Sequence, residues 1–84
     1  MLFGKQAKAA KQLDEKLERI QMNFENNYKD AAQINLREFE ALFTALSEEG
    51  KLSERQKDYY EGRLGDYRAR MRNFTHKDQK ASWD

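Results

Sequence analysis

The stretch Ser47-Glu-Glu-Gly-Lys-Leu-Ser53 decides the fold, because it carries the signals that end one helix and begin another. Gly50 stands where the residue after a helix C-terminus adopts the left-handed conformation, which glycine enters without steric cost. Ser53 and Gln56 have the spacing of a capping box, in which each side chain bonds the other residue's backbone N–H. The stretch therefore predicts the turn of an antiparallel helical hairpin.

Apolar residues at helical spacing flank this turn on both sides. Before the turn they recur three and four positions apart, at Leu36, Phe39, Leu42, Phe43 and Leu46. After it the spacing alternates between four and three, at Tyr60, Leu64, Tyr67, Met71 and Phe74. Such spacing places side chains on one face of an amphipathic helix. We expect the two faces to pack together in a coiled-coil-like seam.

A third apolar stripe precedes the hairpin, at Leu13, Leu17, Ile20 and Phe24. No proline or glycine interrupts residues 5–49. They can therefore form two helices broken at Asn26-Asn27, with Asp30 capping the second, or one long helix. The broken form makes a three-helix bundle. The long helix would leave the stripe in water unless a second chain covered it, so these four residues are candidate self-association residues of a homodimer.

We thus predict an all-α fold, an antiparallel helical hairpin with an additional N-terminal helix. It is either a three-helix bundle or a long-helix hairpin that dimerises. The expected helices cover about residues 5–26, 30–49 and 53–76, within a single domain of residues 1–77. Residues 78–84 lack the apolar pattern, and we expect them to form a polar C-terminal tail.

Acidic and basic residues are unevenly distributed along this chain of 84 residues, although its formal net charge is only +1. Residues 30–50 carry five acidic side chains and one basic, whereas residues 51–77 carry eight basic and four acidic ones. We expect the two arms of the hairpin to pair their opposite charges. The near-neutral total does not favour a strong nucleic-acid binder.

Cysteine is absent, and no apolar run approaches the roughly 20 residues of a membrane-spanning helix. The first residues lack the hydrophobic region of a secretory signal. We therefore expect a cytoplasmic protein with no membrane span. As an alternative, residues 1–12 could attach to a membrane surface through Leu2 and Phe3.

The sequence offers little for catalysis or for binding a cofactor. His76 is the only histidine, and it lies outside the Glu-x-x-His spacing of carboxylate-bridged metal bundles. The four glycines form no phosphate-binding loop. We therefore predict no enzyme, no cofactor and no metal site.

A second stripe in the C-terminal arm, formed by Tyr59, Arg63, Asp66 and Arg70, lies beside the apolar seam, and Gly62 and Gly65 lie on the outer side of the helix. The candidate partner-binding residues are Tyr59, Gly62, Arg63, Asp66 and Arg70. Gly62 and Gly65 each destabilise a helix by about 1 kcal/mol relative to alanine, which suggests that another molecule approaches closely there. Tyrosine and arginine are enriched at interface hot spots. The pattern predicts a non-catalytic protein–protein interaction module, an adaptor, assembly or inhibitor protein of the kind common among bacterial and phage accessory proteins. Its partner is another protein or a second copy of itself.

The alternative function is nucleic-acid binding through the basic C-terminal helix. Its candidate contact residues are Arg68, Arg70, Arg72 and Lys77. Arginines beside an aromatic residue, here Tyr67, suit contact with phosphates and bases. Helical phasing, however, distributes these arginines around the helix instead of along one stripe.

Overall fold

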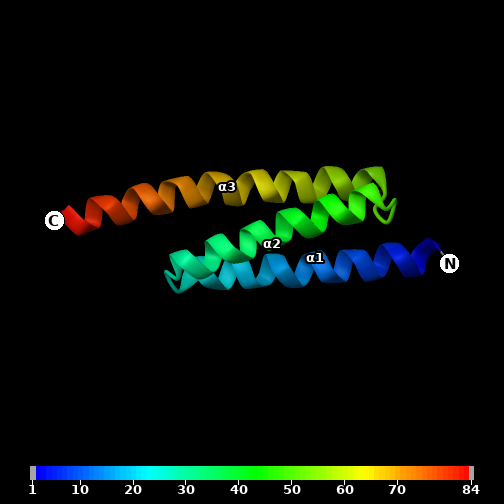
Figure 1. Cartoon of the computed structure of the whole chain (residues 1–84), viewed down its shortest axis with the longest axis horizontal. Coiled ribbons are helices and arrows are strands. Elements are labelled where there is room, and N and C mark those ends of the chain that lie inside the picture. Colours follow the sequence, from blue (N-terminus) through cyan, green and yellow to red (C-terminus); the bar gives the residue numbers. More distant parts are fainter. Residues whose placement is uncertain (1, 84) are drawn as a thin grey trace.

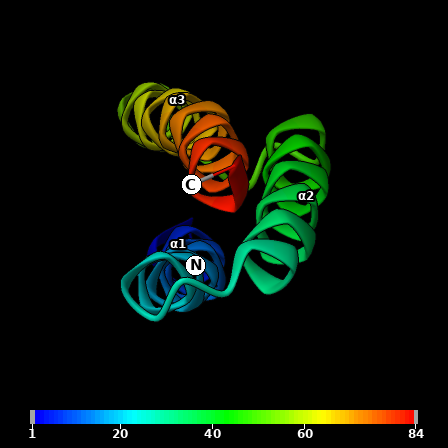
Figure 2. The same cartoon turned by 90° about the vertical axis from the view of Figure 1, so that its left-hand side faces the viewer.

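In the computed structural model, residues 2–83 form three α-helices joined by two short turns (Figure 1). Side chains are described for residue 4 and residues 6–73. Helix α1 spans Leu2–Glu25, α2 spans Lys29–Glu48 and α3 spans Glu54–Trp83. Consecutive helices run antiparallel, so α1 and α3 are parallel, and the end view in Figure 2 places the three at the corners of a triangle. The predicted all-α fold is confirmed, in its three-helix form.

The predicted break at Asn26-Asn27 is confirmed. Asn27 has a φ of 60°, in the left-handed region. The N–H of Tyr28 donates to the carbonyl of Asn23 at 2.8 Å, and the N–H of Asn27 donates to that of Phe24 at 3.2 Å. These two bonds make a Schellman motif, which ends α1. Asparagine tolerates the left-handed conformation better than other residues with a Cβ, so the helix stops without a glycine.

The start of α2 differs from the expectation that Asp30 caps it. Tyr28 occupies the N-cap position and makes no side-chain capping hydrogen bond. Asp30 lies inside the first turn, where its negative charge interacts favourably with the helix dipole. The Schellman motif fixes the chain at Asn27, so the helix begins too early for Asp30 to cap it.

The turn between α2 and α3 confirms the expected role of Gly50, whose φ is 72°. Its N–H donates to the carbonyl of Ser47 at 3.2 Å, and the N–H of Lys51 donates to that of Leu46 at 3.0 Å. This is a second Schellman motif. Leu52, two residues beyond the glycine, is buried in the core.

The predicted capping box at the start of α3 is also confirmed. The backbone N–H of Ser53 donates to Gln56 Oε1 at 2.8 Å. In return, the N–H of Gln56 donates to Ser53 Oγ at 3.1 Å. The Gln56 side chain also reaches the backbone carbonyl of Gln6 in α1 at 3.4 Å, so the cap contributes a contact between helices.

The core lies on the axis of the triangle and draws apolar side chains from all three helices. Its buried members are Ala9, Leu13, Leu17, Ile20, Leu36, Phe39, Leu46, Leu52, Tyr60, Leu64 and Tyr67, with Phe24, Leu42, Phe43 and Met71 partly buried against them. Among the apolar residues of the three predicted faces, Phe74 alone lies outside the described side chains.

Ion pairs connect the helices on the outside of this core. Arg68 of α3 pairs with Glu40 of α2, and this pair joins the basic arm of the hairpin to the acidic arm as expected. Lys16 of α1 pairs with Glu38 of α2. Both pairs are partly exposed, so each contributes at most about 1 kcal/mol to stability.

Helix α3 continues beyond the expected end near His76, as far as Trp83. Its backbone therefore extends past the α1–α2 turn, as the red end of the chain shows in Figure 1. The expected polar tail, residues 78–84, is helical up to residue 83. Loss of the apolar pattern removes burial, but it is not a stop signal, because neither glycine nor proline occurs after residue 65.

Candidate functional site

The seam between α1 and α3 is filled by aromatic rings and arginine side chains. The rings of Phe24 and Tyr67 stack with centroids 5.6 Å apart and an interplanar angle of 7°. The Arg70 guanidinium lies 4.9 Å from the Phe24 centroid and 5.3 Å from that of Tyr67. Arg63 lies 5.2 Å from the Tyr67 centroid. Two cations of α3 thus cover the aromatic pair, an arrangement that adds cation–π attraction to apolar burial.

Gln21 of α1 connects the polar groups of this seam. Its Oε1 accepts hydrogen bonds from the Tyr67 hydroxyl at 2.9 Å and from Arg70 Nη1 at 3.1 Å. Its Nε2 donates to Glu25 Oε2 at 3.0 Å. The Tyr67 hydroxyl in turn accepts a bond from Arg63 Nη2 at 3.2 Å. The two arginines are therefore held in place by contacts within the chain.

Tyr60 crosses the same seam nearer to the N-terminal end of α1. Its hydroxyl donates to Asp14 Oδ1 at 2.8 Å and lies 3.3 Å from the carbonyl oxygen of Ala10. Burial raises the pKa of the Tyr60 phenol above its ordinary value of 10.0, and the adjacent Asp14 carboxylate raises it further. The phenol therefore remains a neutral hydrogen-bond donor.

Tyr59 is an exposed aromatic residue on the outer face of α3. Its side chain is 55% exposed. Its ring nevertheless contacts Tyr60 edge to face, with centroids 4.9 Å apart and an interplanar angle of 77°. Gly62 and Asp66 are exposed on the same helix. Apart from its own helix backbone and chain neighbours, an added Cβ at Gly62 or Gly65 would meet no atom of the described residues within 4 Å, so their packing does not require glycine at either position.

The structure therefore divides the predicted partner-binding stripe into two parts. Arg63 and Arg70 lie over Tyr67 and belong to the α1–α3 seam, where Arg63 is half-buried and Arg70 is still exposed. Tyr59, Gly62 and Asp66 remain on the surface. The sequence pattern placed Tyr59, Arg63, Asp66 and Arg70 beside the core face and Gly62 on the outer side, but it could not show that α1 would lie next to the arginines.

The predicted self-association stripe forms the contribution of α1 to the core. Leu13 and Ile20 are fully buried, Leu17 is nearly so, and Phe24 stacks on Tyr67. In this fold the chain covers the stripe with its own α2 and α3. These residues could meet a second copy only if α1 left its own bundle.

The three predicted nucleic-acid contacts that the structure describes, Arg68, Arg70 and Arg72, do not gather on one surface. Arg68 points toward α2, where it pairs with Glu40, whereas Arg70 lies over Phe24 at the α1 side. Arg72 is exposed, and the side chain of Lys77 lies outside the described residues. The three described arginines therefore form no common basic surface for the alternative function.

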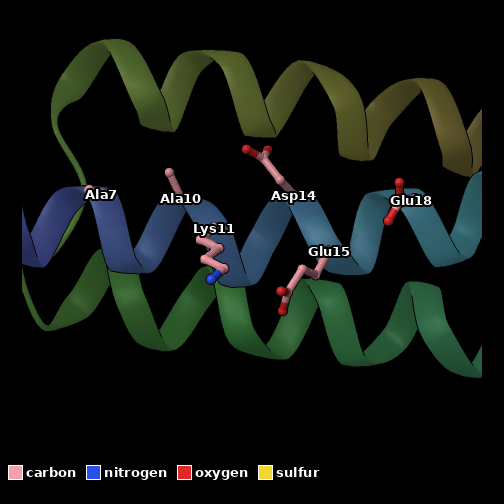
Figure 3. Close-up of a pocket in the computed structure, with 6 residues that line it drawn as sticks. All are labelled: Ala7, Ala10, Lys11, Asp14, Glu15 and Glu18. Atoms are coloured by element: carbon pink, nitrogen blue, oxygen red, sulfur yellow. The ribbon is translucent and has the colours of Figure 1, made fainter.

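A shallow depression lies on the surface of α1, lined by Ala7, Ala10, Lys11, Asp14, Glu15 and Glu18 (Figure 3). Asp14 points from it toward α3, where its carboxylate accepts the Tyr60 hydrogen bond. Over the described residues, no group of three or more histidine, cysteine, aspartate or glutamate side chains could hold a metal ion. None of the helices in the described part of the chain is both long and apolar enough to cross a membrane.

The structure also reveals residues that the sequence patterns missed. Gln21 and Asp14 organise the α1–α3 seam, yet both occupy positions that helical spacing assigns to a polar flank. Ala9 is buried, so the alanine-rich start of α1 also contributes to the core. The spacing of 46 residues in both Asp14–Tyr60 and Gln21–Tyr67 is the parallel register of α1 and α3, and it becomes visible only once the fold is known.

The fold defines a small three-helix bundle protein. No protein-family model matches the chain, and neither the curated proteins nor the solved structures contain a match to it.

Proposed function

We propose that the chain is a small non-catalytic interaction protein that presents the outer face of α3, centred on Tyr59, to a larger protein. The observation that carries this proposal is the setting of Tyr59, which is 55% exposed yet held edge-on against the buried ring of Tyr60. An exposed aromatic ring with a fixed orientation loses little conformational entropy on binding, so it suits an interface anchor.

Gly62 and Gly65 also favour a partner that binds to α3. Each lies inside a helix, exposed, with open space around the position of an added Cβ. Each weakens α3 by about 1 kcal/mol relative to alanine. A partner whose backbone or large side chain approaches α3 closely would account for two such residues beside Tyr59.

The proposal limits the role of the two arginines. Arg63 and Arg70 contact Tyr67, Phe24 and Gln21, so they lie at the border of the surface, and of the two only Arg70 is exposed. Adaptor, assembly and inhibitor proteins all fit this description, since each acts by presenting a helix face.

The proposal is tested by site-specific photo-cross-linking in the cells that encode the chain. A photoreactive phenylalanine analogue at position 59 is expected to capture one discrete partner protein. The matched control carries the analogue at Met22, which is 53% exposed on α1. Tyr59→Ala should abolish the interaction of the captured protein with the chain, while Met22→Ala should preserve it. Equal capture at the two positions, or no capture at position 59, would contradict the proposal.

A further inference from the structure

The two turns of the bundle are built differently. The α2–α3 turn has a glycine in the left-handed conformation and a reciprocal capping box between Ser53 and Gln56. In the α1–α2 turn Asn27 has a φ of 60°. Tyr28 occupies the N-cap position of α2, but its side chain makes no capping hydrogen bond. Asparagine tolerates the left-handed conformation less well than glycine does, and a helix start without a side-chain cap is weak. The α1–α2 turn therefore has the smaller local preference for staying closed.

The apolar pattern continues through this turn. Phe24, Tyr28 and Ala32 are spaced four residues apart, with Ile20 and Leu36 four residues beyond at either end. Neither glycine nor proline occurs between residues 5 and 49. Only residues 26–28 separate α1 from α2. If these three became helical, residues 2–48 would form one helix about 70 Å long.

Straightening the turn would carry α1 away from its own α2 and α3 and leave a complementary surface behind. That surface consists of the residues that now contact α1, among them Glu38, Tyr60 and Tyr67. The α1 of a second copy presents Lys16, Asp14 and Gln21 in the required register, because its sequence is identical. The exchanged helix therefore makes the same contacts with the other chain that it makes within its own chain.

We propose that two copies of this chain exchange their α1 helices, by straightening the α1–α2 turn, to form a domain-swapped dimer. Short hinge segments under strain favour such exchange. In the dimer, two long helices run antiparallel and cross near residues 26–28. Each α1 packs on the α2 and α3 of the other chain, so the core contacts of the closed chain form again between chains.

Tyr28 provides an independent argument for the exchange. It belongs to the apolar stripe by spacing, yet it is 62% exposed at the turn. In the swapped dimer it lies on the helix at the crossing point, next to the same segment of the other chain. The exchange therefore covers a member of the stripe that the closed chain leaves in solvent.

The first test changes the hinge in opposite directions. Asn26→Ala with Asn27→Ala favours helix at the hinge, and each dimer has two hinges, so the association constant should rise by more than about tenfold. Asn27→Gly makes the left-handed conformation of the closed turn more favourable and should lower the association constant. Asn73→Ala, at an exposed position of α3, is the matched control and should leave it unchanged. Light scattering over a concentration series measures the constants.

The second test distinguishes an exchanged dimer from two closed chains that associate side by side. The chain contains no cysteine, so Lys16→Cys with Glu38→Cys introduces a unique pair at the α1–α2 contact. A short bismaleimide should link this pair within one chain in the monomer fraction and between two chains in the dimer fraction. Denaturing electrophoresis then separates the products by mass. Links confined to single chains in the dimer fraction, or identical association constants for the hinge variants, would overturn the proposal.

Discussion

The hydroxyl of Tyr67 in α3 donates a 2.9 Å hydrogen bond to Gln21 Oε1 in α1, although the tyrosine is only 1% exposed. The same hydroxyl accepts a bond from Arg63, and the same Gln21 oxygen accepts one from Arg70. One buried phenol therefore satisfies polar groups on both parallel helices. Buried polar groups are costly when they lose a partner, so this contact fixes the register of α1 against α3.

Tyr67→Phe should reduce the free energy of unfolding by about 1–2 kcal/mol, because it removes both hydrogen bonds of the phenol and leaves Arg63 Nη2 without its acceptor. Urea unfolding followed by circular dichroism measures the change. Tyr59→Phe is the control, since the exposed Tyr59 hydroxyl makes no hydrogen bond to another described residue, and it should stay within about 0.5 kcal/mol of the parent chain. Equal effects of the two substitutions would show that the Tyr67 hydroxyl does not stabilise the seam.

Stability at high pH should depend on Tyr60. Burial and the Asp14 carboxylate raise the pKa of its phenol in the folded chain above 10.0, the ordinary value that holds in the unfolded chain. Below that pH both states keep the proton. Above it the unfolded state loses the proton first, so the free energy of unfolding falls as pH rises toward the folded-state pKa.

Tyr60→Phe isolates this contribution, because phenylalanine does not ionise. Above pH 10 the free energy of unfolding of the parent chain should fall more steeply than that of the variant. Below that pH the two curves should run parallel, separated by a constant offset. Urea unfolding at a series of pH values gives both curves. Parallel curves from neutral pH upward would mean that Tyr60 ionises at the same pH in both states.

Local signals were sufficient to predict the hairpin and the turn between α2 and α3. Gly50, Ser53 and Gln56 act on neighbours within a few residues, and their conformations and hydrogen bonds are as expected. The break at Asn26-Asn27 was predicted only as one of two forms. Its energy depends on whether Leu13 and Ile20 find cover in the same chain, which no local pattern encodes.

The contacts between α1 and α3 could not be predicted from the sequence either, because they also depend on where α1 packs. Helical spacing places Arg63 and Arg70 beside the core face of α3, but only the position of α1 determines whether they contact solvent or the rings of Phe24 and Tyr67. The role of Gln21 could not be predicted either, because a glutamine on the polar side of a helix usually contacts solvent. The exposed position of Tyr59, in contrast, follows directly from its phase on the helix.

The capping box should contribute measurably to stability. Ser53→Ala removes the acceptor of the Gln56 N–H bond and should lower the free energy of unfolding by about 1 kcal/mol. Ser47→Ala is a matched control at the C-terminal end of α2, because the buried Ser47 hydroxyl has no hydrogen-bond partner among the described residues. Removal of the Ser47 hydroxyl should leave the free energy of unfolding unchanged or slightly higher. A larger loss at Ser47 than at Ser53, in the same urea experiment, would contradict this assignment.

The substitution of glycine by alanine should have opposite effects at two positions. Gly50 has a φ of 72°, so Gly50→Ala forces a Cβ into the left-handed conformation and should lower the free energy of unfolding by roughly 1–2 kcal/mol. Gly65 lies inside α3 with nothing within 4 Å of an added Cβ, so Gly65→Ala should raise it by about 1 kcal/mol.

Urea unfolding of the two single variants and of the double variant provides the check. The positions share no contact, so the effects should add and nearly cancel in the double variant. Gly62→Ala should also stabilise the isolated chain, since its surroundings are equally open. If Gly62→Ala at the same time weakens capture of a partner through position 59, then this glycine is present for binding and not for folding. Loss of stability in Gly65→Ala would instead show that the glycine serves the fold of α3 itself.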